Sequence, residues 1–193
     1  LHTRWQGVAL PYTFKRIITL AADSPLIHVD YEVTNNSDRP VHFVWCIHAL
    51  LAIEPGMELL LPPSALFNSG GAFPDTLVPL EKKFKYPFAA SGLNFPSLPE
   101  TNAGRAIKLW SDPLPEGEGW ATMRAGNGEF QMRWDVSLLP QVAVWMNFGA
   151  LGMDGGTPYF NLGLEPCIGA QDSLADAVNQ YNLYATLPPH GSK

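Results

Sequence analysis

The stretch LGLEPCIGAQDSLADA, residues 162–177, is the part of this sequence that most constrains its fold. It places the carboxylate Glu165 inside an apolar run and follows it directly with Pro166. An ionised carboxylate is costly to remove from water unless it is paired or used in chemistry. A glycine ends the run, and Ser173 with Asp176 then approximates a capping box, which predicts a helix of about two turns. The stretch therefore predicts a strand that carries a buried acid, followed by a short helix.

A second apolar run, FVWCIHALLAI at residues 43–53, carries His48. The segment 41–53 is apolar on both faces, so we expect one continuous strand that is covered on both sides. A buried glutamate and a buried histidine from distant strands can form an acid–base pair. Each also has a structural alternative. His48 can be a core histidine with one backbone partner, and Glu165 can bond a turn amide beside its proline.

The composition is that of a single globular chain of 193 residues, and a hydrophobic content of 46% is ample for a core. Twelve basic and 18 acidic residues give a net charge of −6, so we expect neither a nucleic acid nor a membrane as partner. No apolar run in the sequence is long enough to span a bilayer. The two cysteines lack zinc-site spacing and are too few for a disulfide scaffold. We therefore expect no metal, no other cofactor and a cytoplasmic location.

Turn residues and alternating segments predict an all-β fold. Seventeen glycines and 18 prolines separate many short segments. The segment LIHVDYEVT at 26–34 alternates apolar and polar side chains almost without fault, and Asn127-Gly128 is the clearest hairpin signal. We expect residues 62–100 to form a long ordered excursion over one sheet, with short strands around 84–88. Many short strands and one helix predict a sandwich or barrel. The expected strands are 12–22, 26–34, 41–53, 57–61, 106–110, 120–124, 129–136, 142–148, 159–167 and 182–187.

Four motifs occur in the order found in a known family. They are FKRIITL (14–20), VDYEVTNNSDRPVHFVWCIHALL (29–51), PQVAVWMNFG (140–149) and the stretch 162–177. In these motifs the sequence resembles the galactose mutarotase-like (aldose 1-epimerase) family. The resemblance implies an antiparallel β-supersandwich with one short helix near the C-terminus, forming a single carbohydrate-binding domain over 1–193. The family often has a proline and an aromatic residue after the histidine, where this sequence has Ala49-Leu50.

The resemblance also implies a sugar as partner and a mechanism. A mutarotase interconverts sugar anomers by acid/base ring opening, with Glu165 carried over as the base and His48 as the acid. Either Asp75 or Asp112 would be the sugar-binding aspartate. The alternative is a non-catalytic carbohydrate-binding module of the same fold. Family members are longer at the N-terminus and the chain begins at Leu1 without a methionine, so we expect an N-terminally truncated fragment, whose exposed strand edges would favour a homodimer.

Other residues are candidates for the sugar site. Trp145 and Asn147 share one strand face, so they could stack against a sugar and hydrogen-bond to it; a core tryptophan and a strand-ending asparagine are the alternative. Cys46 and Cys167 would line the same pocket if His48 and Glu165 both face it; the alternative is that they are small buried hydrophobes. They could form a disulfide only if their strands are adjacent. Arg133 could contact an anionic sugar or lie on a solvated face.

Overall fold

The computed structural model describes residues 1–54, 56–74, 83–85, 89–90, 93–94, 104–126, 128–169 and 172–193. The chain divides into two compact units, one made of Leu1–Phe43 with Tyr184–Lys193 and the other of Val44–Leu183. That the two units belong to one domain stays a prediction.

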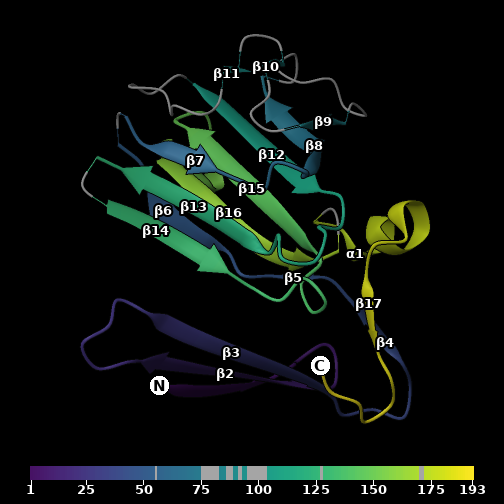
Figure 1. The fold of residues 1–193 in the computed structure, drawn as a ribbon. Coiled ribbons are helices and arrows are strands. Elements are labelled where there is room, and N and C mark those ends of the chain that lie inside the picture. The colour runs from purple at the N-terminus through teal and green to yellow at the C-terminus, as the bar shows by residue number, and fades with distance from the viewer. Residues whose placement is uncertain are drawn as a thin grey trace. The chain divides into compact units, whose positions relative to one another are not determined.

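The first unit is built from antiparallel strands. It contains a three-stranded sheet in the order β1 (His2–Gln6), β2 (Tyr12–Leu20), β3 (Ile27–Asn35), and a ladder of β4 (Val41–Phe43) with β17 (Ala185–Leu187) (Figure 1). The rings of Trp5, Phe14 and Tyr31 stack in sequence across the three strands, with centroids 5.8 Å apart at each step. The alternation at 26–34 thus predicts β3 correctly, while β1 was not expected.

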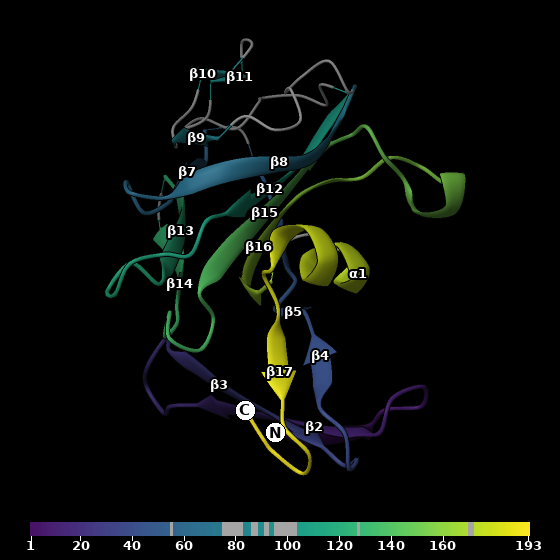
Figure 2. The same ribbon diagram turned by 90° about the vertical axis from the view of Figure 1, so that its right-hand side faces the viewer.

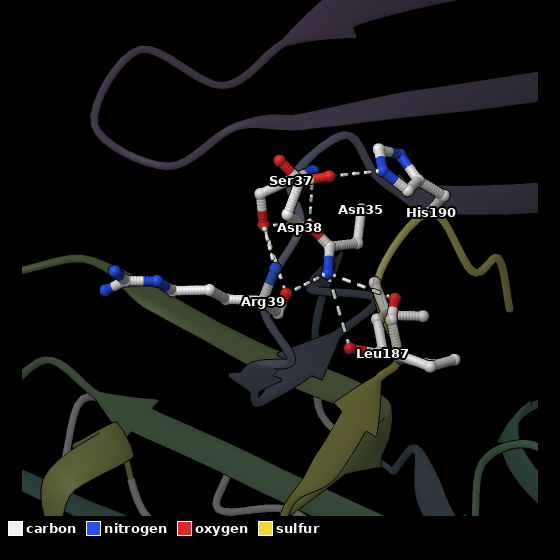
Figure 3. A network of polar contacts seen from close by, with 7 residues as sticks. Asn35, Ser37, Asp38, Arg39, Leu187 and His190 are labelled. Carbon is white, nitrogen blue, oxygen red and sulfur yellow. Dashed lines mark hydrogen bonds and ion pairs between the residues drawn. The ribbon is translucent and has the colours of Figure 1, made fainter.

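One buried asparagine closes the turn after β3. The Asn35 side chain is fully buried, and its Nδ2 donates hydrogen bonds to the carbonyls of Arg39 at 2.7 Å, Pro188 at 3.1 Å and Leu187 at 3.4 Å. Its Oδ1 accepts from the backbone N–H of Ser37 at 3.0 Å and from the Ser37 hydroxyl at 2.7 Å (Figure 3). Asn35 therefore ties the 35–40 turn to the C-terminal segment.

Two antiparallel sheets make up most of the second unit (Figure 2). The larger has the order β5–β16–β15–β12–β8–β9, with β6 also paired to β16, and the smaller has the order β14–β13–β7. The strands of the larger sheet are β5 (Trp45–Cys46), β6 (Ala49–Ala52), β8 (Leu66–Phe73), β9 (Phe84–Lys85), β12 (Arg105–Ser111), β15 (Gln141–Phe148) and β16 (Phe160–Ile168). The others are β7 (Glu58–Leu60), β13 (Trp120–Ala125), β14 (Gly128–Arg133), and the short pair β10 (Ala89–Ala90) and β11 (Leu93–Asn94).

The hydrophobic core lies between the two sheets. Alternate residues of β12, β15 and β16 point toward β7 and β13 and form one buried cluster with them. Because side chains alternate along a strand, the residues between them face the other side of the larger sheet. That second face carries the polar residues of the candidate site. The cluster members on these strands are Leu59, Ile107, Leu109, Ala121, Met123, Val142, Val144, Met146, Phe148, Leu162 and Leu164.

A short helix follows β16, as the sequence predicts. The Ser173 hydroxyl accepts a hydrogen bond from the backbone N–H of Asp176 at 3.2 Å, so Ser173 is the N-cap. The helix α1 (Leu174–Asp176) continues as a π-helical turn, η3 (Ala177–Tyr181), and ends at Asn182 in the left-handed conformation, with φ 52°. A 3-10 turn, η2 (Met153–Gly155), precedes β16. The all-β prediction with one short helix near the C-terminus is confirmed.

The prediction of one continuous strand over 41–53 is wrong. The segment forms β4, β5 and β6, of which β4 pairs with β17 in the first unit and the other two pair with β16. The interruption between β5 and β6 lies opposite Glu165-Pro166. Proline has no N–H to donate to the ladder, so the strand pairing is broken there.

The interpretation of residues 62–100 as an excursion over one sheet is also wrong in its first part. Residues 66–73 form β8, which lies inside the larger sheet and pairs with β12. Strand β9 confirms a short strand at 84–85, and residues 75–82, 86–88, 91–92 and 95–103 lie outside the described residues. A hairpin at the predicted place is confirmed, but its turn begins one residue earlier than Asn127-Gly128: Ala125 pairs with Gly128, which is already part of β14, and Asn127 lies outside the described residues.

Candidate functional site

The strand register brings His48 and Glu165 face to face. Cys46 is paired with Cys167 on one side of the interruption and Ala49 with Leu164 on the other, so the register places His48 directly opposite Glu165. The N–H of Ile47 donates to the Pro166 carbonyl at 3.1 Å, which makes the pairs on either side of it non-hydrogen-bonded. Side chains approach most closely at such pairs, where the Cα atoms are about 4.5 Å apart.

The two side chains are in contact. His48 Nε2 lies 3.2 Å from Glu165 Oε1. The histidine side chain is 45% exposed, whereas that of the glutamate is 2% exposed. The contact is an ion pair by distance, but the ring does not direct a hydrogen bond at Oε1, and this buried oxygen has no hydrogen-bond partner among the described residues. A buried carboxylate oxygen in that state is rare in folded proteins and calls for an explanation.

The other carboxylate oxygen is bound by a lysine. Lys108 Nζ donates to Glu165 Oε2, and the residue is only 8% exposed. Lys108 comes from β12, two strands away from β16; on the intervening strand β15 it is paired with Trp145, whereas Glu165 is paired with Ala143. The same ammonium group lies 5.5 Å from the centroid of the Trp110 ring, within the range of a cation–π contact. The site thus combines a carboxylate from β16, an imidazole from the break between β5 and β6, and a buried cation from β12.

The absence of a side chain at Gly163 lets three neighbouring groups lie close together beside the unpartnered oxygen. Gly163 faces the same side of β16 as Glu165, and a Cβ built on it would lie 3.2 Å from Glu165 Oε1, from His48 Cε1 and from Trp145 Cβ. Across the sheet, Gly163 is paired with Leu50 on one side and Trp145 on the other. Leu50 is 54% exposed and Trp145 is half-buried. An apolar leucine and an aromatic ring therefore flank the glycine.

Both cysteines lie on the site face beside the acid. Cys46 and Cys167 are opposite one another on adjacent strands, which meets the condition for a disulfide, and both are free thiols in this structure. Burial, and next the negative charge of Glu165, raise the pKa of Cys46 to about 11. Burial also raises the pKa of the Cys167 thiol. The two thiols are therefore neutral near pH 7, and they form an apolar border to the site.

Asn147 does not have the free amide that the sequence suggested. It lies on the same face as Trp145, but it is fully buried; its Nδ2 donates to the Leu151 carbonyl at 2.7 Å, and its Oδ1 accepts from the N–H groups of Ala150 at 3.0 Å and Leu151 at 3.2 Å. These bonds hold the loop after β15, which is the strand-ending alternative. The neighbouring strand supplies a different amide. Asn161 is paired with Asn147, and its buried Oδ1 has no hydrogen-bond partner among the described residues.

The remaining candidates lie elsewhere. Asp112 follows β12 and binds Asn68 Nδ2 at 3.0 Å and Lys83 Nζ at 2.6 Å, which gives it a structural role. Asp75 lies outside the described residues. Arg133 is on the exposed strand β14 and donates to Gln131 Oε1 at 2.6 Å. No three His, Cys, Asp or Glu side chains in the described ranges lie close enough to hold a metal ion together.

Sequence reasoning missed Lys108 and Asn161. The segment RAIKLWS at 105–111 places one lysine in an otherwise apolar strand. A lysine in an apolar strand predicts a buried charged partner just as a glutamate in an apolar strand does, because neither residue is fully buried without one. That signal was present in the sequence, but the identity of the partner depends on the register of three strands.

Solved structures of similar fold carry names from sugar metabolism. A candidate aldose 1-epimerase from Klebsiella pneumoniae matches 99% of this chain with a TM-score of 0.70 and 16% identity. A candidate aldose 1-epimerase from Escherichia coli matches 100% of it with a TM-score of 0.67 and 16% identity. A galactose mutarotase related enzyme from Lactobacillus acidophilus also matches 100%, with a TM-score of 0.61 and 14% identity.

The match covers only part of each of those proteins. The chain spans 47%, 60% and 64% of their respective lengths. No protein-family model matches the chain, and no curated protein does. Among the described residues, no helix has the length and apolarity needed to cross a membrane. The sequence identity to these proteins is low, but their backbones match this chain over nearly its whole length. This chain therefore has a galactose mutarotase-like fold.

Proposed function

We propose that this chain carries the acid–base centre of an aldose 1-epimerase-like mutarotase, with Glu165 as the base and His48 as the acid. The observation that carries the proposal is the His48–Glu165 contact with a buried, unpartnered oxygen on the acid. A carboxylate oxygen without a hydrogen-bond donor costs stability, and such costs are concentrated at sites that serve a ligand.

The proposed reaction moves two protons and returns both. Glu165 Oε1 takes the proton of the anomeric hydroxyl while protonated His48 gives its proton to the ring oxygen, and the bond between the anomeric carbon and that oxygen breaks. The open-chain aldehyde turns about its carbon–carbon bond, and the same two groups reverse their roles as the ring recloses on the other face. Neither group is consumed. Acid–base assistance by a positioned side chain contributes about 10²–10⁴-fold, which suits a reaction that already proceeds slowly in water.

The surroundings of the pair suit a sugar ring. Trp145 and Leu50 flank Gly163, and a sugar presents an apolar C–H face that packs on such groups. Asn161 Oδ1 lies on the same face and can accept a hydrogen bond from a hydroxyl. The exposed side of His48 gives a route of access to the acid from solvent.

A non-catalytic carbohydrate-binding module of the same fold is the second candidate. The observation in its favour is the burial of Glu165, which is 1% exposed and has one oxygen occupied by Lys108. A module needs only the aromatic and amide groups, and leaves the acid as a structural ion pair. A homodimer and a cytoplasmic location stay predictions under either function.

Rates of anomer interconversion decide between the two. Freshly dissolved single anomers of a small sugar panel are followed by NMR with the full chain and with the Glu165→Gln and His48→Asn variants. We expect faster interconversion of at least one sugar, and a fall of about 10²–10⁴-fold in that acceleration in each variant. Glu32→Gln and His42→Asn are matched controls on exposed residues of the first unit and should leave the rate unchanged. Shifted sugar signals without acceleration would favour the module, and no effect of either kind would refute both functions.

A further inference from the structure

Lys108 is buried where a lysine is expensive to keep. It is 8% exposed, it lies in a strand whose neighbours are apolar, and its ammonium group binds Glu165 Oε2. A buried ion pair is weak evidence for stability, because replacing both partners with apolar groups is often neutral or stabilising. The pair therefore invites an explanation beyond folding.

The protein holds the ammonium group in place from several directions. The Lys108 and Glu165 side chains together bridge two strand spacings, about 10 Å, across β15, where Lys108 is paired with Trp145 and Glu165 with the small Ala143. The Trp110 ring lies 5.5 Å from Nζ. That ring in turn packs against Gly70, where any larger residue would collide with it, and where the β8–β12 register shifts by one residue. A bulge and a glycine thus place the ring that borders the cation.

The two oxygens of Glu165 are consequently not equivalent. Oε2 is bound by Lys108, whereas Oε1 has no hydrogen-bond partner among the described residues and lies beside His48 and Gly163. Rotation of the carboxylate would exchange the two oxygens, but it would break the charge-assisted bond to the lysine, which is among the stronger hydrogen bonds in proteins.

We propose that Lys108 is a positioning residue for Glu165: by occupying Oε2 it fixes the plane of the carboxylate and leaves Oε1 as the oxygen that accepts a proton from the substrate. The inference rests on the proposed mutarotase function. Lys108 does not touch the sugar in this arrangement and donates no proton to it. Its loss therefore affects the chemical step more than substrate binding.

Kinetic variants of Lys108 separate positioning from a purely structural role. We expect Lys108→Ala to lower kcat by about 10²-fold, the scale of a misplaced catalytic group, with a much smaller change in KM. Lys108→Arg keeps the charge and should recover part of kcat. Because Lys108→Ala leaves space for a small cation, added methylammonium should also recover part of it, whereas tetramethylammonium, which has no N–H, should not. Lys15→Ala removes the lysine of the exposed Lys15–Glu32 pair and serves as the control that leaves kcat unchanged.

A second readout works without any activity. In protein with ¹³C-labelled glutamate carboxyl groups, the Glu165 signal is identified by its absence from Glu165→Gln. We expect Lys108→Ala to move that signal, methylammonium to move it back, and Lys15→Ala to leave it in place. If Lys108→Ala fails to fold, the same comparison is made with Lys108→Arg, whose changed donor geometry also moves the signal.

The outcomes distinguish the two proposals. An unmoved Glu165 signal in a folded Lys108 variant, or an unchanged kcat, overturns the positioning role and leaves the mutarotase function standing. A wild-type chain that accelerates no sugar, combined with a signal that does move, overturns the function but supports Lys108 as the group that orients the acid. Equal losses of kcat for Lys108→Ala with and without methylammonium, together with an unmoved signal, assign the pair to folding alone.

Discussion

Replacing Gly163 with alanine tests whether a ligand reaches Glu165 by passing this residue. The new methyl group would lie 3.2 Å from Glu165 Oε1, His48 Cε1 and Trp145 Cβ. The favourable separation for such atoms is about 3.5–4.0 Å, so each neighbour must withdraw by a few tenths of an ångström. The backbone at Gly163 is not in the left-handed region, so alanine is conformationally acceptable there.

Two opposing effects set the stability change. Crowding in a well-packed region costs about 1–3 kcal/mol. Replacing glycine by alanine at a compatible position restores about 0.4–1 kcal/mol by restricting the unfolded chain. We therefore expect Gly163→Ala to lower the free energy of unfolding by at most about 2.6 kcal/mol, which leaves a folded protein.

The effect on activity should be much larger. The methyl group would lie against Oε1 and displace the carboxylate, so we expect kcat/KM for anomer interconversion to fall by about 10²-fold. Urea denaturation gives the stability and NMR gives the rate. Gly126→Ala is the control, since a Cβ there would meet nothing within 4 Å. A Gly163→Ala protein with wild-type kcat/KM would refute the idea that substrate approaches over this glycine.

Three further predictions concern neighbouring features. Gly70→Ala should displace the Trp110 ring and destabilise the protein by about 1–3 kcal/mol, visible as a changed near-UV circular dichroism spectrum and a lower urea midpoint; an unchanged spectrum would contradict the packing described. Asn35→Ala leaves buried carbonyls unpaired and should cost about 2–3 kcal/mol, with faster amide hydrogen exchange in β3 than in β16; uniform protection would show that the turn does not depend on it. A raised thiol pKa means less thiolate at any pH below it, so alkylation of Cys46 at pH 8 should be about 10²-fold slower than for a thiol with the ordinary pKa of 9.0. The alkylation rate should rise steadily to pH 10, and a plateau near pH 9 would contradict a pKa of about 11.

Local sequence patterns are sufficient to single out Glu165 and His48, the two residues at the centre of the candidate site. Glu165 and His48 stand out because each is a polar residue in an apolar strand, and this property is visible in one segment of sequence at a time. The capped helix after β16 and the alternation of β3 are local in the same way. The correct prediction of an all-β fold follows from the same short segments and their turns.

Non-local features were not accessible to that reasoning. The break between β5 and β6 is caused by Pro166, which lies more than a hundred residues away in the sequence from Ile47 and affects it only through pairing. Strand β8 contains Gly70 and Gly71, which weaken a strand pattern, and only its pairing with β12 reveals it. Lys108 was overlooked because its partner is two strands away. The engagement of Asn147 with its own loop required the backbone path after β15.

The alternation along β16 has a consequence for how this chain can change over evolution. Leu162 and Leu164 face the core. The residues between and beside them, Asn161, Gly163 and Glu165, face the candidate site, so core residues and candidate-site residues alternate along this one strand. Inserting or deleting one residue there would exchange the two sets, placing a carboxylate in the core and leucines at the surface. Substitutions at the positions that face the candidate site leave the core-facing residues unchanged. Length changes in β16 should thus be lethal to the fold, whereas ligand preference can drift by point mutation at its odd-numbered positions.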